Sequence, residues 1–271
     1  MRDFFPGQDV LSYGPGNGVM TEAGSALLSQ YYYASRAGTR GWNSLDMTEE
    51  EYYDIKVQGV VGRSGDTWWD NSLPYDGETA ESMNTWVDHA IDTNTWLVEM
   101  WHSICWDDGT GSGDYVNDHG IHAYRPIPHD IAEKHLQYVS QLQEEGKIWV
   151  AKFDDVIRYM RERQNATLVD NATKTSRVIT LTHDLDPALF NYALTLKSEV
   201  PADWRYAKIE QNLGTQTVEV FEEDGKYYIM YNVYPNEGDI VITKADAMEE
   251  SAIKNLTIYT PEKTQDVIET M

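Results

Sequence analysis

Cysteine and long apolar runs are scarce in this 271-residue sequence. A single cysteine excludes an internal disulfide and every cysteine-rich zinc module. No apolar run reaches the length of about eighteen residues that a transmembrane helix requires. The first ten residues, MRDFFPGQDV, also lack the basic and apolar segments of a signal peptide, so none is expected in this chain.

Positive charge is in deficit as well. Lys and Arg together number 21 against 45 Asp and Glu, which gives a formal net charge of -24. Such a surface repels the phosphates of nucleic acids and of anionic membranes, so neither is expected as a partner. The acidity favours a secreted or periplasmic bacterial protein.

Aromatic residues, by contrast, are abundant, with nine Trp and eighteen Tyr. Seven of the nine Trp lie between Trp42 and Trp106. Tryptophan is usually buried in a core, but its flat face also stacks on the apolar faces of sugar rings. The cluster therefore allows two interpretations, a core and a sugar-binding cleft.

The chain up to about residue 165 alternates short apolar runs with segments of helical periodicity. Strands are expected over 10–13, 57–61, 95–104 and 148–153, and helices over 21–34, 48–55, 78–91, 128–146 and 154–160. This alternation predicts an α/β domain with mainly parallel strands over residues 1–165.

After about residue 165 the pattern changes to short alternating segments rich in Val, Ile, Tyr and Thr. Asp224-Gly225 stands between two such segments and predicts a tight hairpin. We therefore expect a small antiparallel β-sandwich over residues 166–271, with the domain boundary between Gln164 and Thr175.

His102 lies near the end of the strand expected over 95–104. The carboxyl ends of parallel strands face the functional site in α/β barrels and sheets, which favours a functional role over a structural one. Asp88, in the preceding helix, is a candidate for orienting this histidine.

Several segments resemble polysaccharide deacetylases of carbohydrate esterase family 4, the NodB-homology domain. Met100-Trp101-His102 resembles the family's hydrophobic-x-His motif, and Tyr13-Gly14 resembles the end of its R-x-P-Y-G strand. The resemblance implies a partial (β/α) barrel of NodB type over 1–165, a β-rich appendage over 166–271, and a general-acid role for His102. The family's T-F-D-D-G and H-x-x-x-H motifs are absent, so the chain resembles the domain without its first third.

A possible replacement for the missing metal ligands follows the same strand. Asp108 belongs to a Trp-Asp-Asp-Gly sequence, and His119 and His122 follow it. One carboxylate and two imidazoles suit Zn²⁺ or another divalent cation and leave positions open for water. In the alternative interpretation, Asp-Asp-Gly is a turn and the two histidines are solvated loop residues.

Two functions of different classes fit these residues. The first is a metal-dependent deacetylase or esterase that removes acetyl groups from a polysaccharide, with metal-bound water as the nucleophile. The second is a non-catalytic glycan-binding remnant of such an enzyme. A third candidate function is a hydrolase that uses the 106–122 loop.

The aromatic residues expected to bind substrate are Tyr13, Trp68, Trp69, Trp101 and Trp106. A barrel without its early strands would expose sheet edges, so a homo-oligomer is expected.

Overall fold

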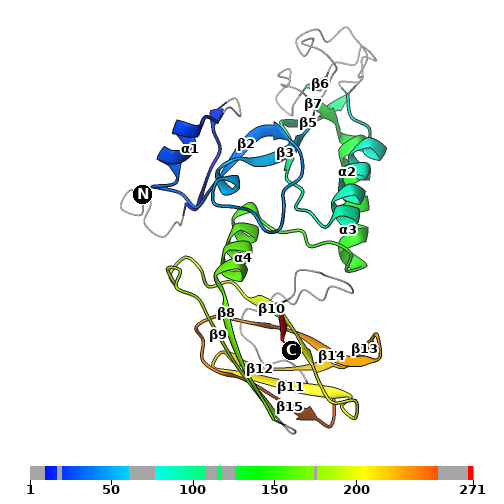
Figure 1. Ribbon diagram of the computed structural model, residues 1–271. Coiled ribbons are helices and arrows are strands. Elements are labelled where there is room, and N and C mark those ends of the chain that lie inside the picture. The colour runs from blue at the N-terminus through cyan, green and yellow to red at the C-terminus, as the bar shows by residue number, and fades with distance from the viewer. Residues whose placement is uncertain are drawn as a thin grey trace. The chain divides into compact units, whose positions relative to one another are not determined.

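The computed structural model describes residues 10–16, 20–60, 77–107, 115–116, 126–173, 176–249 and 268–270. The chain divides into two compact units, Met1–Val150 and Ala151–Met271 (Figure 1). This division falls earlier than the boundary expected near residue 165. The reason is that helix α4 (Phe153–Asn165) packs on the β-sheet core of the second unit, partly through Tyr159.

A parallel sheet forms the centre of the first unit. Among the described residues it has four strands, which lie side by side in chain order. They are β1 (Ser12–Tyr13), β2 (Ala34–Arg40), β3 (Ile55–Gly59) and β4 (Glu99–Met100), and every pairing between neighbours is parallel. The predicted α/β class with parallel strands is therefore confirmed.

The first unit has four helices in its described part. They are α1 (Glu22–Leu28), the short 3-10 helix η2 (Glu51–Tyr53), α2 (Ala80–Thr93) and α3 (His129–Glu144). Two of them, α1 and α2, begin at a threonine side-chain cap. Thr79 and Ser82 form a reciprocal capping box at the start of α2, each side chain accepting from the other residue's backbone N–H. Asn94 ends α2 with a left-handed φ of 50°.

Four expected elements differ from the structure. The helix expected over 48–55 is reduced to the 3-10 helix η2, and Ile55 begins β3. The helix expected over 21–34 ends at Leu28, and residues 34–40 form the strand β2. The hydrogen bonds that β2 makes with β1 and β3 favour a strand here, although the apolar residues have helical spacing. The strand expected over 95–104 is two strands in different sheets. Its second half, β5 (Ser103–Asp107), pairs with β6 (Tyr115–Val116) and β7 (Pro126–Pro128). Residues 148–152 form no strand and lead into α4.

The second unit contains two β-sheets that share one apolar core. One sheet has the strand order β13-β14-β10-β16, and the other has the order β12-β11-β15-β9-β8. Their bounds are β8 (Thr167–Ala172), β9 (Ser176–Thr182), β10 (Leu194–Glu199), β11 (Tyr206–Gln211), β12 (Gly214–Glu219), β13 (Phe221–Glu223), β14 (Lys226–Val233), β15 (Ile240–Ala245) and β16 (Ile268–Thr270). Among the described residues of this unit, the strand pairings are antiparallel except that between β10 and β16.

Alternation along these strands builds the core. Ile179 and Leu181 of β9, Leu196 of β10 and Ile229 of β14 are almost completely buried in one cluster to which both sheets contribute. The predicted hairpin is also confirmed, since residues 224 and 225, between β13 and β14, both have positive φ. In the described part of the chain, no helix has the length and apolarity that crossing a membrane requires.

Candidate functional site

The carboxyl edge of the parallel sheet carries two of the predicted site residues. Tyr13 ends β1, its ring centroid lies 5.4 Å from that of Tyr32, and the residue is 39% exposed. His102 follows the end of β4 by two residues and is exposed. Both residues therefore lie at the edge where ligands of parallel sheets usually bind.

Asp88 and Trp101 have partners in the helical layer. Asp88, on α2, accepts a hydrogen bond from the Tyr138 hydroxyl on α3, and this bond raises the pKa of Tyr138 to about 12. The indole N–H of Trp101 donates to Glu99 at 3.0 Å, and its side chain packs against a buried cluster that includes Met83. Asp88 therefore connects α2 to α3, and part of the Trp101 side chain is buried in the core of the first unit.

The remaining predicted residues lie outside the described part of the chain, or have side chains outside it. They are Trp68, Trp69, Trp106, Asp108, His119 and His122. Among the residues that the structure describes, no group of three or more His, Cys, Asp or Glu side chains could hold a metal ion. The zinc site and its ligands stay predictions.

A buried histidine connects α3 to the end of β4. His135 is 0% exposed, and its Nε2 lies 3.1 and 3.2 Å from the two carboxylate oxygens of Glu99. Its Nδ1 lies 2.8 Å from Oδ1 of Asn84 on α2. A carboxylate can only accept, so Nε2 carries a hydrogen. Both ring nitrogens of His135 thus have a hydrogen-bond partner, Glu99 on β4 and Asn84 on α2.

The sequence patterns did not point to this network, although two signals were present. Glu99 is a carboxylate inside an otherwise apolar run, where it needs a partner. His135 lies four residues after Ile131 on the inner side of α3. The spacing of the apolar residues in the helix expected over 128–146 predicts that Leu136 is buried, which is wrong, because Leu136 is 51% exposed.

Arg36 reaches across the same sheet from β2. Its Nη1 lies 2.8 Å from Sδ of Met100 on β4, and β3 lies between those two strands. Two glycines leave the space for this arrangement. A Cβ on Gly14 would lie 3.3 Å from Nη2 of Arg36, and a Cβ on Gly59 would lie 3.2 Å from the methyl group of Met100. The guanidinium group of Arg36 therefore lies among Gly14, Gly59 and Met100, which are far apart in the sequence.

Arg40, on the same strand, has a different environment. Its Nη2 donates to the Gly59 carbonyl at 2.8 Å and lies 3.4 Å from the Glu78 carboxylate. Arg36 contacts no carboxylate among the described residues. The edge thus offers an aromatic ring, a histidine and a guanidinium that could bind an anion.

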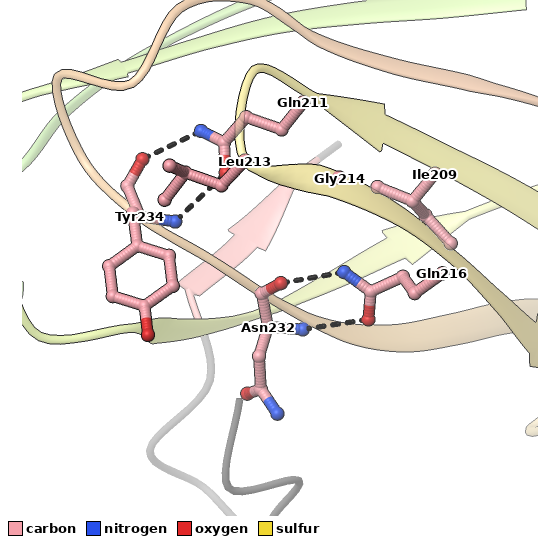
Figure 2. A pocket seen from close by; sticks show the side chains of 7 residues that line it. All are labelled: Ile209, Gln211, Leu213, Gly214, Gln216, Asn232 and Tyr234. Atoms are coloured by element: carbon pink, nitrogen blue, oxygen red, sulfur yellow. Dashed lines mark hydrogen bonds between the residues drawn. The ribbon is translucent and has the colours of Figure 1, made fainter. Parts of the chain in front are cut away.

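The second unit has a shallow pocket, which Figure 2 shows from close by. Two glutamine side chains that line it form hydrogen bonds with backbone groups of the protein. Gln216 on β12 bonds both the carbonyl and the N–H of Asn232 on β14, at 2.6 and 3.4 Å. Gln211 bonds the same two groups of Tyr234, at 2.7 and 3.1 Å. These amides join the two sheets, so the pocket is better explained as structure than as a binding site.

The comparisons with known proteins find a relative of this chain. A gellan lyase from a Bacillus species is 33% identical to this chain over 227 residues, which cover 80% of this chain and 8% of the lyase. The chain therefore spans about 8% of the length of the curated relative that it matches. No protein-family model and no solved structure matches the chain.

This comparison corrects the predicted reaction. The sequence patterns were interpreted as those of a polysaccharide deacetylase, a hydrolase that removes acetyl groups. The relative is a lyase, which belongs to a different reaction class. The prediction of a deacetylase was therefore wrong, and the general-acid role of His102 in deacetylation loses its basis.

Proposed function

We propose that this chain is a polysaccharide-binding part of a carbohydrate-active protein, and that the carboxyl edge of its parallel sheet is the binding surface. The observation that carries the proposal is the 33% identity to a gellan lyase over 80% of this chain. The predicted polysaccharide partner is kept in this proposal, and the predicted deacetylation is not.

The residues at the edge support a sugar ligand. Sites for sugars combine aromatic faces with a few oriented polar groups. Tyr13 leaves part of its ring exposed at the end of β1, while its contact with Tyr32 holds the ring in place. His102 at the end of β4 and Arg36 on β2 add hydrogen-bond donors at the same edge.

Two further expectations belong to this proposal. Secretion or a periplasmic location fits a polymer ligand that is too large to enter a cell. A NodB-type barrel fits the chain-order arrangement of the parallel strands, and it concerns the fold of the first unit rather than its reaction.

The proposal is tested by measuring binding to gellan and to a panel of neutral and acidic polysaccharides, using isothermal titration calorimetry. We expect Tyr13→Ala to weaken binding up to about tenfold, because it removes one stacking face. Tyr31→Ala is the matched control, since Tyr31 is 67% exposed and lies in a turn after α1. Failure to bind any polysaccharide, or equal losses in both variants, would contradict the proposal.

A further inference from the structure

We infer that two copies of this chain associate as a symmetric dimer through an apolar patch formed by helix α1 and the residues beside the start of strand β1. The patch consists of Val10, Ala23, Ala26, Leu27 and Tyr31, all of which are exposed, and is called the α1 patch below. The inference goes beyond polysaccharide binding and does not depend on it.

Helix α1 has an apolar side that faces solvent. None of its seven residues is buried. Ala23, Ala26 and Leu27 share one exposed side, because residues three or four positions apart lie on the same face of a helix, and Leu27 is 56% exposed. The half-buried side of the helix includes Gly24 and Ser25. A surface helix normally has the opposite arrangement, with its larger apolar side chains toward the core.

Val10 and Tyr31 extend the patch beyond the helix. The backbone N–H of Tyr33 donates to the Leu11 carbonyl at 2.8 Å, so the segment that follows α1 lies beside the start of β1. Val10 is 38% exposed and Tyr31 is 67% exposed. Single exposed apolar residues are common, but apolar residues that two neighbouring segments expose together indicate an interaction surface.

The charge of this region favours a second copy as the partner. Residues 10–40 contain one carboxylate, Glu22, and two arginines, Arg36 and Arg40, whereas the whole chain has a net charge of -24. Two copies of so acidic a protein repel each other over most of their surfaces. Around a two-fold axis the same patch of each copy meets the other, and an apolar patch without excess negative charge is complementary to itself. The α1 patch therefore allows association without that repulsion.

Sedimentation velocity of the full chain, from about 1 to about 100 μM, measures the association. We expect a monomer–dimer equilibrium in which the dimer becomes more stable as salt rises from about 0.05 to about 0.5 M, because salt screens the repulsion between acidic copies and leaves apolar contacts intact. Leu27→Glu should weaken dimerisation about a hundredfold or more, because the two-fold axis brings a charge from each copy into the contact.

Two further variants separate a lost contact from a change in charge or in fold. Leu136→Glu is the matched control, because Leu136 is 51% exposed on α3, outside the α1 patch, and this variant should dimerise like the wild type. Ala23→Glu adds a charge to the patch in the first turn of α1, where a carboxylate stabilises a helix, and should also weaken dimerisation. Circular dichroism checks the fold of each variant, and Ala23→Glu decides the question if Leu27→Glu does not fold.

The outcomes that would overturn the inference are distinct. A wild-type chain that stays monomeric over the whole range of concentration and salt would do so. A dimer that persists in both Leu27→Glu and Ala23→Glu would show that the contact lies elsewhere. An equal loss in Leu136→Glu would show that net charge, rather than the α1 patch, controls association. Polysaccharide binding is measured separately by calorimetry, and none of these results contradicts it.

Discussion

Oε2 of Glu162 lies 3.6 Å from Nε2 of His183, and the two side chains are 0% and 1% exposed. Neither atom has a hydrogen-bond partner among the described residues. Nδ1 of His183 accepts from the backbone N–H of Leu185 at 3.2 Å, so in the neutral ring the hydrogen is on Nε2 and faces Glu162. The pair therefore joins helix α4 to the end of β9 inside the second unit.

Burial governs the protonation of this pair. It raises the pKa of Glu162 to about 8, although the hydrogen bond from the Tyr192 N–H and the positive charge of Arg158 both act to lower it. Burial also lowers the pKa of His183, against the neighbouring charge of Asp184. At pH 7 both side chains are neutral in the folded protein.

We expect the free energy of unfolding to fall as pH rises from about 6.5 to about 8. Across this range Glu162 keeps its proton in the folded chain but has lost it in the unfolded chain, so unfolding releases a proton. The corresponding slope is at most about 1.4 kcal/mol per pH unit. The lowered pKa of His183 has the opposite effect, but only below its ordinary value of 6.5.

Glu162→Gln should remove this dependence on pH. Urea unfolding of the wild type and the variant, measured at half-unit intervals from pH 6 to pH 8, tests the prediction. Glu222→Gln, on the exposed strand β13, is the control and should keep the wild-type slope. The same slope in Glu162→Gln as in the wild type would contradict the assignment.

His135→Gln should destabilise the first unit. The variant removes the imidazole N–H that donates to Glu99, a carboxylate that is 20% exposed and keeps the Trp101 indole N–H, at a cost of about 1–3 kcal/mol. Tyr138→Phe removes an exposed hydrogen bond to Asp88 from the same helix and should cost less than about 1 kcal/mol. Chemical unfolding followed by tryptophan fluorescence compares the two variants.

The double variant Glu99→Gln with His135→Gln checks the reason for the loss. It should recover part of the stability lost in His135→Gln, because a neutral amide at position 99 needs fewer hydrogen-bond donors than a carboxylate does. A double variant less stable than the single one would indicate that packing, rather than hydrogen bonding, explains the effect.

The sequence predicted those parts of the fold that local chemistry determines. Thr21, the first residue of the helix expected over 21–34, accepts from the N–H of Gly24 at the start of α1. Asp224 and Gly225 adopt the positive φ values that a tight hairpin requires. Alternation of apolar residues likewise predicted the strands of the second unit, because one face of each strand enters a shared core.

Tertiary pairing determined what the sequence could not show. Residues 34–40 form a strand because they pair with β1 on one side and β3 on the other. The local spacing of apolar residues gives no signal for this pairing. In the candidate site, Tyr13 ends β1 and His102 follows β4, and their role in binding stays a prediction. The approach of Arg36 to Gly14 and Met100 depends on the order of four strands, and a single sequence gives no signal for it.

Thr79→Ala should lower the free energy of unfolding by about 1 kcal/mol, the usual cost of an N-cap. The hydroxyl of Thr79 accepts from the Ser82 N–H at 3.2 Å, and an alanine would leave that donor without a partner inside the helix. Thr85→Ala is the control, since Thr85 lies on the same helix and only donates back to the Ser82 carbonyl. Thermal unfolding should separate the variants, and equal midpoints would contradict a capping role.

Gln216→Ala should be more destabilising than Gln211→Ala, although each removes a side chain that bonds two backbone groups (Figure 2). Gln216 is 5% exposed, so water cannot readily replace its bonds to Asn232, and two buried backbone groups are left without partners. We expect a loss of about 3 kcal/mol for Gln216→Ala. Gln211 is only half-buried, so water can reach the Tyr234 backbone, and a loss of about 1 kcal/mol is expected. Urea unfolding measures the free energy of unfolding of both variants. If Gln211→Ala loses as much of it as Gln216→Ala, or more, the amide of Gln216 does not hold the two sheets together.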